Sequence, residues 1–274
     1  MSATGLYFTA PLCLLHSGDS ALDALERCLS CGIVNAGIGH QKTHGEEAFQ
    51  HLLTAATAHA QSQRLPTACP ENTNLFLWQA ALAGSHILDI RGGNSAHHAT
   101  FYQTHHQPGE VFFRLRADWM WGGLYTAREA AGKEALPAPF KLLTWREFRI
   151  LAAILSAKVN TYGFTFLGWE SIQARACGFH SKALFEAGKG TLPAYCQPLS
   201  RDVIRAELDK LEALGFFARC RYAKGPRGGF MAYSLRHPKR EGLADAIKQW
   251  AAANQAFKTK VTALRADDLV AFAS

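Results

Sequence analysis

The chain has 274 residues, of which 48% are hydrophobic and 19% are charged. This composition supports a buried core and excludes an intrinsically disordered protein. The formal net charge is +7 at pH 7, and residues 141–250 hold 18 basic against 9 acidic residues, while the rest of the chain holds 11 against 13. The C-terminal half therefore carries the positive charge, which points to a polyanionic partner.

The cysteine content and the apolar segments bear on the cellular compartment. The seven cysteines are an odd number without a regular spacing, which predicts reduced thiols rather than a disulfide framework. The N-terminal residues lack the basic segment of a secretory signal, and no apolar run approaches the length of a membrane-spanning helix. We therefore expect a soluble, cytoplasmic protein without a membrane partner.

The first part of the chain mixes strand and helix signals. Strands are expected at residues 6–15, 86–90 and 110–115, and helices at residues 21–30 and 46–60. The segment Leu136-Pro-Ala-Pro139 then imposes an extended link, because each proline disfavours helix at the residue before it. We therefore place an N-terminal mixed α/β domain at residues 1–136, and no motif assigns it a role.

Past this link the helix signals become sharper. Thr144-Trp-Arg-Glu147 has the form of a capping box, and the apolar residues after it recur at helical spacing, so a first helix should run to about Lys158. Residues 164–167 favour a short strand, and residues 169–177 favour a second helix that ends at Gly178.

A third helix and a basic hairpin follow. Ser200 is the expected N-cap of the helix, and Gly215 is its expected end. Residues 216–222 and 229–235 alternate as paired strands should, and a short basic tip separates them. Residues 216–240 contain seven Lys or Arg and no Asp or Glu.

This order of elements, with the phrase Leu208-Asp-Lys-Leu-Glu-Ala-Leu-Gly-Phe-Phe-Ala-Arg and the closing Tyr233-Ser-Leu235, resembles the winged helix-turn-helix superfamily over residues 141–237. The resemblance implies an α+β protein in which the N-terminal domain precedes a winged-helix DNA-binding domain at residues 140–240. It also implies that the third helix enters the major groove of double-stranded DNA while the hairpin lies along the flanking backbone or minor groove. We therefore expect a sequence-specific DNA-binding protein.

On this model the arginines at the start of the third helix read the bases. Arg201 and Arg205 are expected to make bidentate contacts to guanine edges, and Ser200 is expected to contact phosphate with the help of the helix N-terminus. The basic residues of the hairpin are expected to neutralise phosphates. The residues expected to contact DNA are Ser200, Arg201, Asp202, Arg205, Arg219, Arg221, Lys224, Arg227, Arg236, Lys239 and Arg240.

Alternatives to this interpretation stay open. Asp209 and Glu212, farther along the helix, would repel phosphates. The helix and hairpin also fit a packed structural subdomain whose charges are only solvated, or a winged domain that binds protein. Residues 179–199 are longer than the usual turn of three or four residues, and they fit an extra short helix with a loop. That insertion would add backbone contacts through Lys182 and Lys189 or would mediate oligomerisation.

A C-terminal amphipathic helix is expected at residues 241–265. Its apolar residues follow a heptad pattern with one Asn in the middle, which is typical of a dimeric coiled coil. The residues of this seam are Leu243, Ile247, Trp250, Asn254, Phe257, Val261 and Leu264. The alternative to a homodimer is a helix that packs on the N-terminal domain of its own chain.

The sequence favours no metal, no cofactor and no catalytic residue. Cys28, Cys31, His40 and His44 have the side chains of a zinc site, but their central gap is shorter than in a zinc finger, and cysteines three apart in a helix are more often core residues. The histidine-rich residues 97–106 lack the His-hydrophobe-His pattern of a relaxase and fit a polar loop. Neither a phosphate-binding loop, a dinucleotide fingerprint nor a nucleophile elbow occurs.

The favoured role is therefore transcriptional regulation through binding of double-stranded DNA. One alternative is a replication-initiation or maintenance protein of a plasmid or other mobile element, because such initiators resemble this domain and pair it with a second one. An alternative of another class is a metal-dependent nucleic-acid enzyme that uses the N-terminal histidines.

Overall fold

The computed structural model describes residues 7–90, 110–116, 143–223, 229–237 and 239–253. The protein is α+β, with helices and two small antiparallel sheets, as expected from the sequence. It divides into a first unit, residues 1–156 with 174–198, and a second unit, residues 157–173 with 199–274. The domain boundaries predicted at residues 136 and 140 lie outside the described residues and stay predictions. No helix in the described ranges is both long and apolar enough to cross a membrane.

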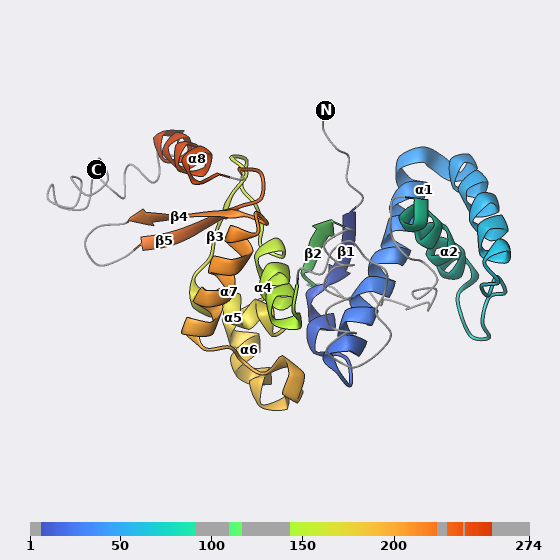
Figure 1. The fold of residues 1–274 in the computed structure, drawn as a ribbon, viewed down its shortest axis with the longest axis horizontal. Helices are drawn as coiled ribbons and strands as arrows, with labels where there is room; N and C mark the ends of the chain where they lie inside the picture. The colour runs from blue at the N-terminus through green and yellow to red at the C-terminus, as the bar shows by residue number, and fades with distance from the viewer. Residues whose placement is uncertain (1–6, 91–109, 117–142, 224–228, 238, 254–274) are drawn as a thin grey trace, which may run out of the picture. The chain divides into compact units, whose positions relative to one another are not determined.

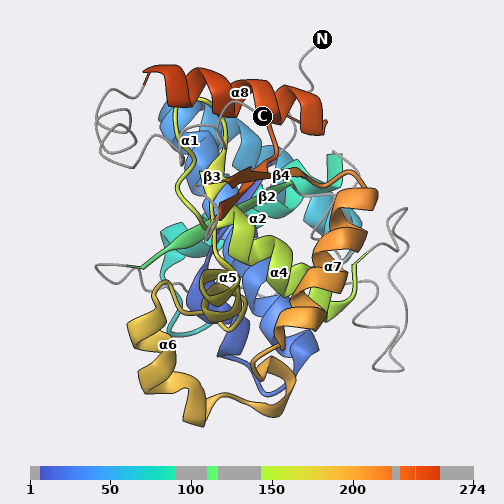
Figure 2. The same cartoon turned by 90° about the vertical axis from the view of Figure 1, so that its left-hand side faces the viewer.

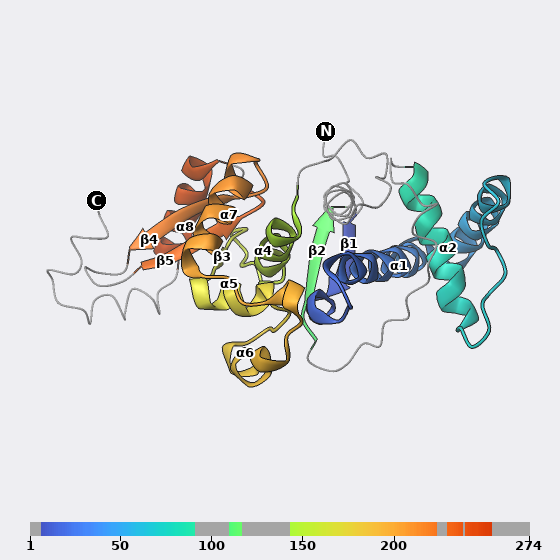
Figure 3. The ribbon, with the colours of Figure 1, turned by 60° about the horizontal axis from the view of Figure 1, so that its bottom comes forward.

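Two helices dominate the first unit and pack side by side (Figures 1 and 3). α1 (Ala21–Ser62) begins at Ser20, whose Oγ accepts a hydrogen bond from the backbone N–H of Asp23 at 3.1 Å. α1 bends at Gly45, where φ is 87°, a left-handed conformation that favours glycine. The two helices predicted at residues 21–30 and 46–60 are therefore the two halves of one bent element.

α2 (Leu75–Ile90) includes the segment 86–90, so the strand predicted there is wrong. The apolar end of this segment resembles a short strand, but the buried side chains of Trp78, Ala81, Ser85 and Leu88 recur every three or four residues. That spacing lines one face of a helix. The surface that contacts α1 therefore decides the conformation.

Two glycines let the backbones of α1 and α2 approach closely. A Cβ atom on Gly37 of α1 would collide with the carbonyl oxygen of Ala80 in α2. A Cβ atom on Gly84 of α2 would collide with the carbonyl oxygen of Ile33 in α1. Both obstacles are backbone atoms, which cannot rotate away as a flexible side chain can. A side chain larger than hydrogen at either glycine would therefore force the two helices apart.

The sheet of the first unit pairs β1 (Tyr7–Pro11) with β2 (Phe112–Arg116), and Ala10 lies opposite Phe113. The strand predicted at residues 110–115 is confirmed, whereas the one predicted at 6–15 ends early because Leu12–His16 forms a 3₁₀ turn. Phe113 is fully buried and meets Phe148 edge-on, with ring centroids 6.0 Å apart.

Phe148 belongs to α4 (Trp145–Leu155), so this aromatic contact joins α4 to the first unit. The predicted capping box is confirmed. The hydroxyl of Thr144 accepts from the backbone N–H of Glu147 at 3.3 Å, and the Glu147 carboxylate accepts from the backbone N–H of Thr144 at 2.6 Å.

Residues 174–198 complete the first unit. They contain α6 (Lys182–Gly188), capped by Ser181, and the 3₁₀ turns Lys189–Thr191 and Ala194–Cys196. The prediction of an extra short helix with a loop is therefore confirmed. This insertion has its own small core of Ala174, Cys177, Phe185, Leu192 and Cys196.

The second unit is built on a three-stranded antiparallel sheet in the order β3-β5-β4. Its elements are β3 (Thr165–Phe166), α5 (Trp169–Ala176, whose last three residues count with the first unit), α7 (Arg201–Ala213), β4 (Ala218–Ala223), β5 (Gly229–Ser234) and α8 (Arg240–Ala253). The predicted caps are confirmed, because Ser200 Oγ accepts from Val203 N–H at 3.3 Å, and Gly215 and Gly178 have φ values of 80° and 89°.

α7 and α8 cover opposite faces of this sheet (Figures 1 and 2). Leu243, Ala246 and Ile247 of α8 are buried against Phe164, Ala218 and Ala232, and Trp250 is partly buried beside them. Three residues of the predicted heptad seam, Leu243, Ile247 and Trp250, therefore pack inside their own chain, on the sheet of the second unit. Asn254, Phe257, Val261 and Leu264 lie outside the described residues, and dimerisation stays a prediction.

Candidate nucleic-acid interface

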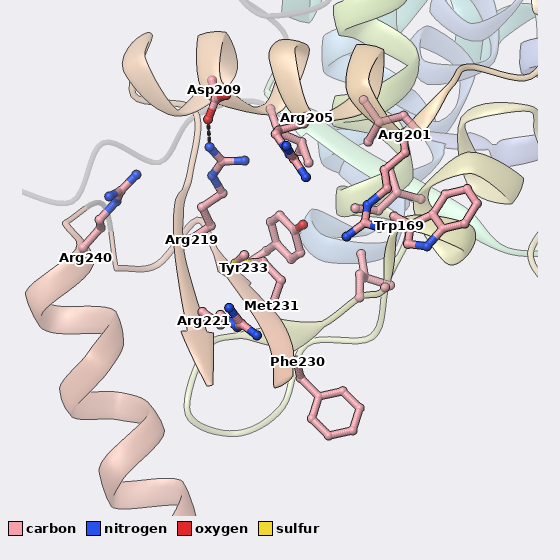
Figure 4. Close-up of a pocket in the computed structure, with 15 residues that line it drawn as sticks. Trp169, Arg201, Arg205, Asp209, Arg219, Arg221, Phe230, Met231, Tyr233 and Arg240 are labelled. Carbon is pink, nitrogen blue, oxygen red and sulfur yellow. Dashed lines mark hydrogen bonds and ion pairs between the residues drawn. The ribbon is translucent and has the colours of Figure 1, made fainter. Parts of the chain in front are cut away.

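A groove with a volume of about 630 Å³ lies in the second unit between α7, the start of α5 and the sheet (Figure 4). Five arginines line it: Arg201, Arg205, Arg219, Arg221 and Arg240. Its floor includes the apolar side chains of Ile172, Ile204, Leu208 and Met231. The groove thus has apolar side chains at its base and arginine side chains along its edges.

Helical periodicity places two of these arginines. Ile204, Leu208 and Leu211 are buried and fix the inward face of α7. Arg201 and Arg205 are four residues apart, so they project from the same side of the helix, and both are exposed. Figure 4 shows both side chains extending from α7 toward the groove.

Strand alternation places two more. Ala218, Cys220 and Tyr222 of β4 pack with the α8 side of the sheet. Arg219 and Arg221, the residues between them, point to the opposite face and line the groove. The period of two therefore brings arginines of β4 to the same groove as those of α7.

The charge of Arg219 is already neutralised within the unit. Its Nε donates to Glu212 Oε2 at 2.8 Å, its backbone N–H donates to Glu212 Oε1 at 3.2 Å, and its guanidinium also pairs with Asp209. The side chain is only 12% exposed, and burial lowers the pKa of Arg219 below its ordinary value. The side chain of Arg219 therefore stabilises the fold and is less available than an exposed arginine to bind a ligand.

Arg240 shares the same acidic partner. Its Nε and Nη2 donate to the two oxygens of Glu212 at 2.8 and 2.7 Å. Burial raises the pKa of Glu212, but the hydrogen bonds from Arg240 and from the backbone of Arg219 outweigh it and lower the pKa below 4.5. Asp209 and Glu212, which the sequence suggested would repel phosphates, instead balance two basic residues.

Arg201, Arg205 and Arg221 have no acidic partner among the described residues, and all three are exposed. Their positive charges face one groove without internal compensation. A guanidinium in this state is available for bidentate hydrogen bonds to phosphate or to a guanine edge.

The remaining predicted contact residues lie apart from the groove lining. Ser200 and Asp202 are exposed at the start of α7, where the Ser200 hydroxyl caps the helix. Arg236 and Lys239 are exposed beyond the end of β5. Lys224 and Arg227 lie outside the described residues.

One exposed aromatic residue of the groove is not among the residues predicted to contact DNA. Trp169, the first residue of the second predicted helix, is 41% exposed at the edge of the groove, near Arg201 in Figure 4. The position of Trp169 in the sequence could have indicated this exposure. Trp169 is the first residue of α5, and the first buried residue of α5 is Ile172.

The candidate zinc residues do not assemble a metal site in the part of the chain that the structure covers. Cys28 and Cys31 are buried in α1, while the rings of His40 and His44 contact each other at an interplanar angle of 42°, with centroids 4.6 Å apart. Within the described ranges no three potential ligands gather. The histidine-rich residues 97–106 lie outside those ranges.

The groove thus combines three uncompensated arginines, an exposed tryptophan and an apolar floor. Such a surface suits a polyanion that also has planar apolar groups. Nucleic acids have both, in their phosphates and their bases. Comparisons with protein families, with curated proteins and with solved structures found no match for this chain.

Proposed function

We propose that the second unit binds double-stranded DNA and that the protein is a sequence-specific transcriptional regulator. The observation that carries this proposal is the groove to which Arg201, Arg205 and Arg221 bring positive charge without acidic partners. Three such charges from two elements favour a ligand with several negative charges at a regular spacing.

The architecture of the unit supports the proposal. A helix, α7, is followed by the paired strands β4 and β5, and β3 adds to the same sheet. This is the order that the resemblance to the winged helix-turn-helix superfamily implies. On this model α7 is the recognition helix and the β4–β5 hairpin is the wing.

The two arginines of α7 and the arginine of β4 take different parts in binding. Arg201 and Arg205 lie near the N-terminus of α7, where a recognition helix meets base edges, so they read sequence. Arg221 lies on the strand and contacts phosphate, which adds affinity without specificity. Asp209 is paired with Arg219 and therefore repels the duplex less than its formal charge suggests.

The direct test is a binding titration with single-alanine variants. A preferred duplex is first selected from random sequences with the wild-type protein. Arg201→Ala and Arg205→Ala should each weaken binding to that duplex by about 1–3 kcal/mol, roughly 5- to 150-fold. Arg221→Ala should weaken binding to all duplexes alike and reduce the slope of log K against log salt by about 1.

Lys248→Ala is the matched control, because Lys248 is 80% exposed on α8 and its loss removes the same charge. It should bind DNA like the wild type. The proposal fails when the wild type retains no duplex at low salt, or when the groove variants bind as well as Lys248→Ala. Genome-wide recovery of bound fragments then separates promoters from a replication origin, which is the outcome that the plasmid-initiator alternative requires.

A further inference from the structure

A buried arginine in the first unit lacks an acidic partner. Arg149 of α4 is only 3% exposed, and its Nη1 and Nη2 both donate to the backbone carbonyl of Gln197 at 3.3 Å. Its Nε has no hydrogen-bond partner, and no carboxylate pairs with it in the described residues. A guanidinium stays protonated even when buried, so its charge favours an anion close by.

The side chain in contact with this guanidinium is a cysteine. Nη1 of Arg149 lies 3.3 Å from Sγ of Cys196, which is itself fully buried. Cys196 is the one ionisable group that Arg149 contacts among the described residues. A thiolate at this position would supply the missing negative charge.

A second buried thiol completes the cluster. Cys177, directly after α5, belongs to the same small core cluster as Cys196 and is also fully buried. The hydrogen bond from Cys177 lowers the pKa of Cys196, and the charge of Arg149 acts in the same direction against the effect of burial. The interaction with Cys196 and burial raise the pKa of Cys177, so Cys196 takes the thiolate form more readily than Cys177.

We propose that small hydroperoxides oxidise Cys196, whose sulfur lies beside the guanidinium of Arg149, and that Cys177 resolves the product to an intramolecular disulfide. The thiolate of Cys196 attacks a peroxide oxygen, so an S–O bond forms while the O–O bond breaks and the leaving oxygen takes a proton as water or alcohol. The sulfur of Cys177 then attacks the resulting sulfenic acid, the S–S bond forms, and the S–O bond breaks with release of water. Two thiols are oxidised and one hydroperoxide is reduced.

Burial restricts the oxidant. Neither sulfur reaches the surface, so a hydroperoxide of a few atoms fits the site better than glutathione disulfide, whose mixed-disulfide intermediate needs room for a tripeptide. Three other cysteines have less thiolate character, because burial raises the pKa of Cys28, Cys13 and Cys220. This site lies in the first unit and does not depend on DNA binding.

The test treats the full-length protein with hydrogen peroxide, blocks the remaining thiols in denaturant and digests it with trypsin without reduction. Cleavage after Arg175, Lys182, Lys189 and Arg201 releases the two cysteines on separate peptides, residues 176–182 and 190–201. A disulfide joins these peptides and is read by mass spectrometry. We expect this linkage after peroxide, and none after the same exposure to glutathione disulfide.

Two variants separate the steps. Cys177→Ser should stop the reaction at a sulfenic acid on Cys196, which a dimedone probe traps, while Cys196→Ser should leave Cys177 unmodified. Arg149→Gln should slow oxidation about tenfold or more, and Arg149→Lys should retain part of the rate. Circular dichroism checks the folding of each variant. If the Arg149 variants do not fold, the Cys177→Ser and Cys196→Ser variants still test the proposal.

Cys28→Ser is the matched control, since Cys28 is an equally buried thiol, and it should form the Cys177–Cys196 disulfide at the wild-type rate. A disulfide between Cys28 and Cys196 would overturn the proposal. So would oxidation of the partly exposed Cys69 or Cys220 before Cys196, or reaction of the pair only in unfolded protein.

Discussion

The backbone N–H and the Nε of Arg219 donate to the two carboxylate oxygens of Glu212, at 3.2 and 2.8 Å. This double contact ties the start of β4 to the end of α7. It also separates the basic residues of the groove into two groups: those that balance acids within the unit, and those whose charge faces outward uncompensated. The first prediction follows from that separation.

Arg219→Ala should lower the free energy of unfolding by about 1–3 kcal/mol, because it removes a partner from a carboxylate that is only 13% exposed. Arg221→Ala, on the same face of the same strand, should change stability by less than about 0.5 kcal/mol. Denaturant titrations monitored by circular dichroism measure both. Equal losses in the two variants would mean that the Arg219–Glu212 contact contributes nothing specific to the fold.

The depressed pKa of Glu212 predicts a pH-dependent stability. Its ordinary value is 4.5, so the stabilisation is fully present above that pH and is lost as the pH falls through the lower folded value. The wild type should exceed Glu212→Gln in unfolding free energy at pH 7, and the difference should shrink toward pH 3.

Asp245→Asn is the control for this series. Asp245 is 67% exposed and lies 3.5 Å from Lys248, so its ion pair is solvated and should contribute little at either pH. A constant gap between the wild type and Glu212→Gln over the whole pH range would contradict the predicted role of the charge.

The glycine contacts between α1 and α2 predict a large effect from a small change. Gly37→Ala and Gly84→Ala should each destabilise the protein by about 1–3 kcal/mol or more, because the added methyl group meets a backbone carbonyl. Gly39→Ala is the control, since a Cβ there meets nothing within 4 Å. It should be neutral or stabilise the helix by about 0.5–1 kcal/mol. Thermal unfolding of the three variants distinguishes these outcomes.

The burial of α8 on the sheet predicts that Leu243 stabilises the chain that carries it. Leu243→Ala should cost about 2–5 kcal/mol of unfolding free energy, because it opens a cavity at a fully buried position. The exposed substitution Lys248→Ala should leave stability within about 0.5 kcal/mol of the wild type.

Sedimentation velocity at two concentrations shows whether this loss depends on association. We expect the destabilisation of Leu243→Ala in the monomer. A loss that appears only where the protein is a dimer would instead favour the heptad seam as an intermolecular contact.

Much of the local structure was predictable. Thr144 and Glu147 form the expected capping box, Ser200 begins α7, and Gly215 ends it in the left-handed conformation. The alternation that places Arg219 and Arg221 on one face of β4 also follows from residue spacing alone. Each of these features depends on residues within a few positions of one another.

Other features depend on partners far along the chain. Residues 86–90 look like a strand until their contact with α1 is known, and α4 joins the first unit because Phe148 meets Phe113. Arg149 and Cys196 are 47 positions apart in the sequence, so no local sequence pattern predicts their contact.

The sequence by itself determined where α4 begins, where α7 begins and ends, and that the C-terminal half is basic, because caps, periodicity and net charge are properties of neighbouring residues. Only the tertiary structure decided which of those charges remain available. Arg240 reaches Glu212 across 28 positions of sequence and Arg219 across seven, whereas Arg201, Arg205 and Arg221 meet no described acid. Ion pairs form between groups that folding brings within about 4 Å of each other. The number of charges along the chain does not reveal which groups will lie that close.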